Sequence, residues 1–404
     1  MKWRSMMRKF RLLFLVIILL LTVASSVHGE TEELIIGDIV VKGLTRTDPQ
    51  LVLKHLPVGI DDQWSAETEA LIVQTLFGTN IFDPFSIAIS TEAMTGNKVR
   101  VIIQVEDAGY FMLHPYIYVF YLVGDLTESQ FTQRIINPWG NGVSFSVGVN
   151  WKADDFANDA PGPWQSVGFD FLGANGSIYT YEFRNFEEHK KFNQRSFELN
   201  GQRHKLFMRH FINPNLTMGY TLTYQNAAYL EEGTLSEQKY VIAALRTDLA
   251  DLRINLGHGF ALEDGADYSY GSFNYAKSLA VAEDKVVYSL KGGLATDHTP
   301  LNFQFLAGGY NSIPLRGHEY ELAGNAYLVN NLEYRKQLPV SDLYGLVCVD
   351  LGKVAERASD FTKADFMLDA GLGLGYDTPM GMFRLEVGFD LLNGGNTWEF
   401  RFVL

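Results

Sequence analysis

The sequence predicts a mainly β protein, in which a transmembrane antiparallel β-barrel spans residues 110–404 and one small α+β domain precedes it at residues 33–107. Three observations predict this class. Aromatic residues reach 13% and glycines number 37, while hydrophobic residues at 47% are no more frequent than in soluble proteins. Only one long apolar run is present, at the N-terminus, whereas a helical membrane protein repeats stretches of about 20 apolar residues. From Tyr110 onward, segments of about ten residues alternate between apolar and polar positions, as barrel strands do.

The N-terminal segment, residues 1–29, is typical of a secretory signal peptide. An apolar core at Leu12–Ala24 is followed by small residues and preceded by five basic ones, Lys2, Arg4, Arg8, Lys9 and Arg11. The alternative is an uncleaved anchor helix, but a core of about 13 residues is short for a hydrocarbon layer of about 30 Å. We therefore expect an exported protein.

Charge and cysteine content exclude several classes of function. The formal net charge is −14, and removing the five basic residues of the signal segment makes it −19. A chain this acidic is not expected to bind nucleic acid. Cys348 is the only cysteine, so no intramolecular disulfide can form, and no cysteine follows the signal core to carry a lipid anchor.

Residues 33–107 predict the order strand, helix, helix, strand, strand. Asp48 and Ser65 are candidate N-caps of the two helices, with Pro49 in the first turn of the first one. The predicted elements are a strand at Leu34–Val41, a helix from Pro49, a helix from Ser65 to about Phe77, and strands at Phe85–Thr91 and Lys98–Glu106.

This module resembles a POTRA domain. The resemblance is carried by the order of its elements, by Val41-Lys42-Gly43-Leu44 at the front and by Leu76-Phe77-Gly78-Thr79-Asn80-Ile81-Phe82 in the middle. Such domains lie in the periplasm in front of barrels that assemble or translocate proteins, and the exposed edge of a small sheet can accept an extended peptide. A small α+β domain with no particular role is the alternative.

The barrel prediction rests on which residues alternate. In residues 383–391 the large apolar side chains occupy one face, while the other face carries Arg384, Glu386, Gly388 and Asp390. A soluble sandwich would also alternate, but large apolar residues outside and charged or glycine residues inside are typical of a transmembrane barrel. We count about eleven strands before residue 308 and about five after residue 322, which makes about 16, with fourteen or twelve as alternatives.

Signatures of enzymes and cofactor sites are not recognisable. The segment Gly142–Ser146 lacks the final glycine of a nucleophile elbow, and Gly371, Gly373 and Gly375 have the wrong spacing for a dinucleotide-binding turn. The nine histidines show no paired spacing on a helix, so no metal site is expected. We expect neither catalysis nor a cofactor. The glycines at alternate inward positions more simply make room inside the barrel or permit the strands to bend.

One loop, Gly308–Tyr320, precedes the last five predicted strands and contains Arg316-Gly317. This loop resembles the Arg-Gly loop of the outer-membrane assembly and translocation barrel superfamily that contains BamA, TamA and the two-partner secretion transporters such as FhaC. Three further segments match in order, namely Leu332-Glu333-Tyr334-Arg335, Val349-Asp350-Leu351-Gly352 and the run from Gly371 to Gly381.

The resemblance implies that the loop folds into the lumen and that Arg316 pairs with an acidic side chain of the wall. Asp350 is the first candidate partner, with Glu333 and Asp369 behind it, because alternation assigns all three to the lumenal face. An Arg fork matches a carboxylate with two parallel hydrogen bonds, so the pair would fix the loop in place.

The chain departs from the superfamily pattern in three ways. His318 and Glu319 stand where an aromatic residue usually follows Arg-Gly, and the usual C-terminal aromatic is Leu404. The final strand nevertheless keeps one apolar face, which predicts a recognition signal for barrel insertion, formed by Trp398, Phe400, Phe402 and Leu404. The single POTRA-like domain is fewer than the essential assembly protein carries.

The resemblance implies a factor of the outer membrane of a Gram-negative-type bacterium, with the POTRA-like domain in the periplasm. Its expected activity is to insert or translocate polypeptides without covalent chemistry. Its expected partners are outer-membrane lipid, unfolded or strand-forming client polypeptides, and periplasmic chaperones or accessory lipoproteins. The alternatives are a passive pore, a structural surface protein, or a transporter dedicated to one secreted partner.

Overall fold

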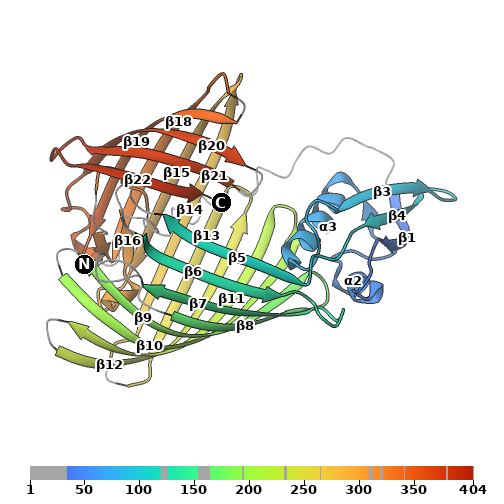
Figure 1. Ribbon diagram of the computed structural model, residues 1–404, viewed down its shortest axis with the longest axis horizontal. Coiled ribbons are helices and arrows are strands. Elements are labelled where there is room, and N and C mark those ends of the chain that lie inside the picture. The colour runs from blue at the N-terminus through green and yellow to red at the C-terminus, as the bar shows by residue number, and fades with distance from the viewer. Residues whose placement is uncertain are drawn as a thin grey trace, which may run out of the picture.

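The computed structural model describes residues 34–119, 126–152, 164–192, 195–231, 234–263, 265–308, 313–318, 322–340, 342–378 and 381–403. The predicted signal peptide at residues 1–29 lies outside them. Figure 1 shows the α+β domain in blue beside one end of a large rolled sheet. No helix in the described part of the chain combines the length and apolarity needed to cross a bilayer.

The α+β domain consists of a four-stranded sheet, in the order β2-β1-β4-β3, and two helices. Asp48 caps the first helix by accepting from the N–H of Gln50, and Ser65 caps the second by accepting from the N–H of Thr68. Both predicted caps are thereby confirmed. The elements are β1 (Leu34–Lys42), α2 (Pro49–His55), β2 (Gln63–Trp64), α3 (Ala66–Thr79), β3 (Ala88–Ala93) and β4 (Lys98–Gln104).

The predicted strand at Phe85–Thr91 was wrong at its start, because β3 begins only at Ala88. A turn around Asp83 holds the preceding residues. The Asp83 side chain accepts from the N–H of Phe85, and its carbonyl accepts from the N–H of Ser86. Asp side chains compete for nearby backbone donors in this way, and they thereby delay entry into a sheet.

The second sheet is antiparallel and contains 16 strands, which follow one another in chain order from β5 to β15 and then from β18 to β22. The prediction of a mainly β, antiparallel barrel is confirmed. The first eight strands are β5 (Phe111–Val119), β6 (Leu126–Ile135), β7 (Val143–Lys152), β8 (Trp164–Leu172), β9 (Ser177–Phe192), β10 (Arg195–Asn213), β11 (Leu216–Glu231) and β12 (Thr234–Leu249). The others are β13 (Leu252–Ala261), β14 (Tyr268–Val281), β15 (Asp284–Ala295), β18 (Ala326–Gln337), β19 (Leu343–Ala355), β20 (Met367–Thr378), β21 (Gly381–Asp390) and β22 (Asn396–Val403).

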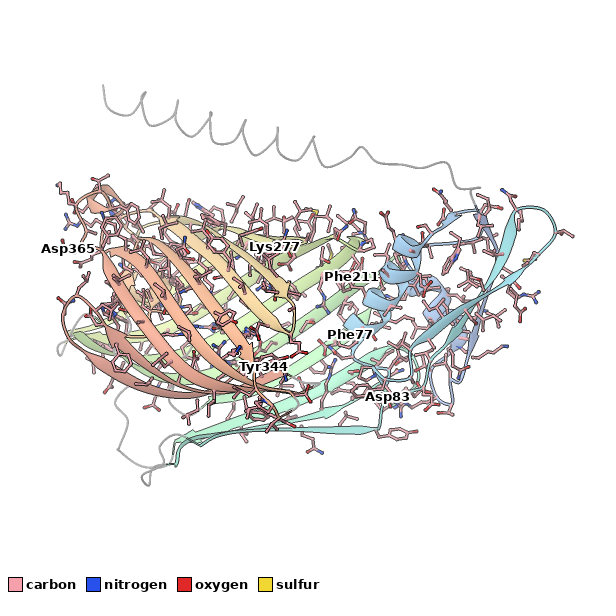
Figure 2. The ribbon with its side chains drawn as sticks, turned by 90° about the horizontal axis from the view of Figure 1, so that it is seen from above. Phe77, Asp83, Phe211, Lys277, Tyr344 and Asp365 are labelled. Carbon is pink, nitrogen blue, oxygen red and sulfur yellow. The ribbon has the colours of Figure 1, made fainter. Side chains whose placement is uncertain are left out.

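The two faces of this sheet have the polarity of a transmembrane barrel. On β19, Val347, Val349 and Leu351 are exposed on the outer face, while Cys348 and Asp350 are buried on the inner face. Large apolar side chains facing outward around a polar interior suit a lipid environment, and they would be costly in water. Figure 2 shows the two ends of the barrel, with Tyr344 at the end near the α+β domain and Asp365 at the far end.

The α+β domain is held against the near rim of the barrel by the end of α2. The carbonyl oxygens of Lys54 and His55 accept from the backbone N–H groups of Asn175 (3.1 Å) and Gly176 (2.5 Å) in the β8–β9 turn. Both turn residues have positive φ, 53° and 70°, a conformation that Asn and Gly adopt at the lowest cost. His55 is buried and its Nδ1 lies 2.7 Å from the Gly173 carbonyl oxygen. Burial lowers the pKa of His55, against an opposing effect of that hydrogen bond.

The end of α3 makes a second contact with the barrel. Arg209 Nη2 on β10 donates to the carbonyl oxygen of Gly78 at 2.6 Å, and a cation beside the last carbonyls of a helix is electrostatically favourable. Phe211, Leu71 and Ile178 form a buried cluster there. Figure 2 shows Phe211 at the junction of the two parts. The helix ends and the barrel rim therefore satisfy one another's polar groups.

Candidate functional site

The candidate site lies where the long connection between β15 and β18 meets the inner wall of the barrel. Two short strands, β16 (Phe305–Ala307) and β17 (Leu322–Gly324), pair within this connection. Between them the structure describes residues 313–318. Leu315 is buried in a cluster with Ala307, Tyr327 and Val329. This apolar packing brings the next residue, Arg316, to the wall.

Arg316 is buried and directs its guanidinium group at carboxylates from three strands. Its Nη2 lies 3.0 Å from Glu333 Oε2 on β18, and its Nε lies 3.1 Å from Glu386 Oε1 on β21. Its Nη1 donates to Asp350 Oδ1 on β19, and its backbone N–H donates to Asp350 Oδ2 at 3.1 Å. Burial disfavours the charged form, but the neighbouring carboxylates outweigh it and raise the pKa of Arg316.

The charges that contact Arg316 or its carboxylate partners balance one another. Arg384 contacts Glu333 and lies 2.9 Å from Glu386, while Arg335 Nε lies 2.6 Å from Glu333. Three arginines therefore face three carboxylates, those of Glu333, Asp350 and Glu386. Buried ions are tolerated when each is paired and hydrogen-bonded, and removing one member leaves an uncompensated charge that costs about 3–5 kcal/mol.

A row of three buried aspartates crosses the neighbouring strands at the same height. Asp369 on β20 is the register partner of Asp350 on β19 and of Asp390 on β21. Like charges directly opposite each other destabilise a sheet. The loop supplies donors to this row, because the N–H of Gly317 lies 2.9 Å from Asp369 Oδ2 and His318 Nδ1 lies 3.1 Å from the same oxygen. His318 Nε2 is 3.7 Å from Asp390 Oδ2.

Glycines on the wall make room for the loop. A Cβ atom on Gly388 would lie 1.7 Å from the Arg316 carbonyl oxygen, and one on Gly371 would lie 2.8 Å from Arg316 Cδ. A Cβ atom on Gly317 itself would lie 2.3 Å from the backbone nitrogen of Asp390. Gly371 on β20 and Gly388 on β21 thus form part of the surface on which the loop rests.

The structure places the sequence-predicted residues as follows. Asp350 and Glu333 contact the Arg316 side chain, whereas Asp369 contacts Gly317 and His318. Sequence reasoning missed Glu386, Arg384 and His318 as parts of the site. Alternation had already assigned Glu386 and Arg384 to the polar face, which was the available signal, but it does not tell how deep in the lumen each residue lies.

The predicted C-terminal signal is described only as backbone. The register pairs Phe400 with Leu385 and Phe402 with Phe383, two residues exposed on the outer face. The side chains of Trp398, Phe400 and Phe402, and all of Leu404, lie outside the described residues. The signal stays a prediction.

Two groups of described residues bring three potential metal-binding atoms within 4.8 Å of one another. They are His318 with Asp369 and Asp390, and Glu333 with Cys348 and Glu386. In the second group, arginine side chains already lie against both carboxylates. In the first group the histidine itself faces both aspartates. In the second group the arginine side chains take the place of a metal ion, and in the first group the histidine already hydrogen-bonds Asp369, so we assign no metal to either group.

Comparison with known proteins adds two findings. Residues 264–404 match the family model described as the Omp85 superfamily domain, a range that contains the loop and the five barrel strands after it, β18 to β22. Similar solved structures include CdiB from Acinetobacter baumannii, with a TM-score of 0.63 and 13% identity over 91% of this chain and 73% of that one. BamA from Haemophilus ducreyi lacking POTRA domains 1–3 has a TM-score of 0.59 and 12% identity over 91% and 84%. CdiB from Escherichia coli has a TM-score of 0.55 and 12% identity over 94% and 90%. At these identities the likeness shows a shared fold.

Proposed function

Residues 264–404 form an Omp85 superfamily domain, and from this premise we propose that the chain is an outer-membrane factor that inserts or translocates polypeptides without covalent chemistry. The observation that carries the proposal is the anchored loop. A largely buried cluster of six charges fixes the loop against the inner wall, and a barrel that handles clients needs a lumen whose loop stays in a defined place.

The α+β domain supports the same proposal as a periplasmic POTRA domain that receives the client. Strand β3 is an edge of its sheet and most of its residues are exposed, as the order β2-β1-β4-β3 requires. An exposed edge presents unpaired backbone donors and acceptors, to which an extended polypeptide can add as another strand. Unfolded or strand-forming clients, delivered by periplasmic chaperones or accessory lipoproteins, are the partners that fit this edge.

The second step, entry of the client into the membrane, is assigned to the barrel. In the described sheet β5 and β22 are the two ends of the strand order, so each is the other's natural partner in a closed barrel. A weak seam between them would let a client strand enter the lipid. Two of the solved relatives are CdiB proteins and one is a BamA. Both barrel insertion and secretion of one dedicated partner are therefore outcomes to distinguish.

Replacing Arg316 by Ala tests the proposal. The change leaves the carboxylates of Glu333, Asp350 and Glu386 with one buried cation fewer, so we expect the loop to leave the wall at a cost of about 3–5 kcal/mol in its anchorage. Proteolysis of the loop should accelerate and client levels in the outer membrane should fall, while the amount of barrel stays near that of the wild type. The matched control is Arg253→Ala, because Arg253 pairs with Asp248 on a different part of the wall.

The readouts are quantitative proteomics of outer membranes from a deletion strain that expresses each variant, and single-channel conductance in planar bilayers. Loss of particular outer-membrane proteins indicates insertion, and loss of one exported protein indicates dedicated secretion. A wide, constitutively open conductance that Arg316→Ala leaves unchanged, together with an unaltered proteome, would establish the passive pore instead.

A further inference from the structure

The site contains two more carboxylates than arginines, and His318 lies between these two carboxylates. The three arginines compensate Glu333, Asp350 and Glu386, so the two remaining aspartates of the row, Asp369 and Asp390, have no arginine partner among the contacts of the cluster. His318 lies between these two aspartates, with one ring nitrogen toward each, at 3.1 and 3.7 Å. Both ring nitrogens of a histidine can donate only when the ring is protonated.

We propose that His318, in its protonated form, is the positioning residue that fastens the loop to Asp369 and Asp390, so that anchorage of the loop depends on pH. The inference deepens the loop anchor on which the proposed function rests. It concerns a residue where the chain departs from the aromatic that usually follows Arg-Gly in the superfamily it resembles.

Three aspartates near His318 favour its charged form, and one arginine, Arg316, disfavours it. Asp369 comes from β20 and Asp390 from β21, and Asp350 on β19 is the register neighbour of Asp369. Arg316, two residues earlier on the same loop, is the opposing cation, but its guanidinium group is already directed at Asp350, Glu333 and Glu386. The Asp369 hydrogen bond raises the pKa of His318, burial opposes it, and the charges of Asp369 and Asp390 add to the rise.

The direction of the pH effect follows from the upward shift in the pKa of His318. A histidine whose pKa is higher in the anchored state than its ordinary value near 6.5 contributes its full stabilisation below that value. The contribution is lost as the pH rises through the raised pKa, because Asp369 and Asp390 then face a neutral ring. The loop should therefore be held most firmly below about pH 6.5, and it should loosen as the pH rises through the raised pKa of His318.

Hydrogen exchange of the full-length protein, measured by mass spectrometry on peptides that contain Gly317, tests the proposal without any client. The N–H of Gly317 donates to Asp369, so its protection reports directly on the anchored loop. After correction for the intrinsic effect of pH, wild-type protection should be constant in weak acid, fall by about tenfold per pH unit between the ordinary pKa near 6.5 and the raised pKa of His318, and level off above it. Heat-modified gel migration checks that each barrel is folded.

Three variants make the result decisive. His318→Lys keeps a cation at all pH values tested and should keep the loop protected in alkali, whereas His318→Gln should be as poorly protected in acid as the wild type is in alkali. His298→Gln, at an exposed position of the same connection, is the control and should follow the wild type. Full acid protection in His318→Gln, or a flat wild-type profile, would overturn the proposal. Loss of protection with EDTA would also overturn it, by assigning the cation to a metal. Because no client is involved, failure here leaves the proposed function standing.

Discussion

Arg316 owes its position to what surrounds it more than to any single ion pair. The apolar neighbour Leu315 is buried against the wall, and glycines at 371 and 388 leave the space into which the arginine backbone and side chain fit. Charge then selects the orientation, since the donors of the guanidinium meet carboxylates of β18, β19 and β21. Shape and charge must both be present for the loop to reach the wall.

This dependence on shape gives a prediction for Gly388→Ala. The added Cβ atom would lie 1.7 Å from the Arg316 carbonyl oxygen, and the backbone on both sides leaves no flexible side chain to yield. Overpacking of this kind costs about 1–3 kcal/mol or more, so the loop should detach although every charge remains. Gly345→Ala is the matched control, because its Cβ atom meets only Leu338 at 3.9 Å. Equal loop protection in both variants, measured by limited proteolysis, would contradict the role of Gly388.

The candidate site could be predicted from the sequence only as far as faces and order allow. Alternation placed Glu333, Asp350 and Asp369 on the inner wall, and the Arg-Gly motif directed attention to Arg316. The position of Glu386 could not be predicted, because the height of a side chain depends on the stagger accumulated across β18 to β21 and not on the alternation within one strand. His318 meets partners from two different strands, 51 and 72 residues further along the chain.

At the scale of elements, the two helices of the α+β domain are joined to the barrel by their C-terminal ends. Helix ends leave carbonyl groups unpaired, and the β8–β9 turn and Arg209 supply the missing donors. The helices themselves were predictable, because the caps at Asp48 and Ser65 are local. The docking was not, because its contacts join residues as distant as His55 and Gly173, 118 positions apart.

Gly78→Ala tests whether this docking is specific. Alanine within a helix is favoured over glycine by about 0.5–1 kcal/mol, so the isolated helix should become more stable. At this position, however, the new Cβ atom would lie 2.5 Å from the buried ring of Phe211, and the domain should be displaced from the rim. Disulfide formation between cysteines introduced at Leu71 and Ile178, which share one buried cluster, should therefore slow relative to the same pair in the wild type. Gly59→Ala, whose Cβ atom meets only Asp62 at 4.0 Å, should leave it unchanged. Faster or equal cross-linking in Gly78→Ala would mean that the domain is not held at this point.

At the scale of the whole molecule, the barrel is uneven around its circumference. Strand β10 has 19 residues, whereas β5 and β22, the ends of the strand order, have 9 and 8. At about 3.3 Å per residue, such strands barely cover a hydrocarbon layer of about 30 Å. The α+β domain contacts β10 and the turns between β6 and β7 and between β8 and β9, and the anchored loop lies against β18 to β21. The pair β5 and β22 combines short strands with its place at the two ends of the strand order.

This unevenness predicts where a client enters the membrane. Cysteine pairs with one member in Phe111–Val119 and the other in Asn396–Val403 can be scanned for rapid oxidation, while Cys348 stays in place because it is buried. If clients pass between β5 and β22, the disulfide should stop their appearance in the outer membrane and a reductant should restore it, with the loop still protected from protease. Single-cysteine variants control for the substitutions themselves. Client delivery that continues through a fully cross-linked seam would assign the route to the lumen, and with it the function to secretion of a dedicated partner.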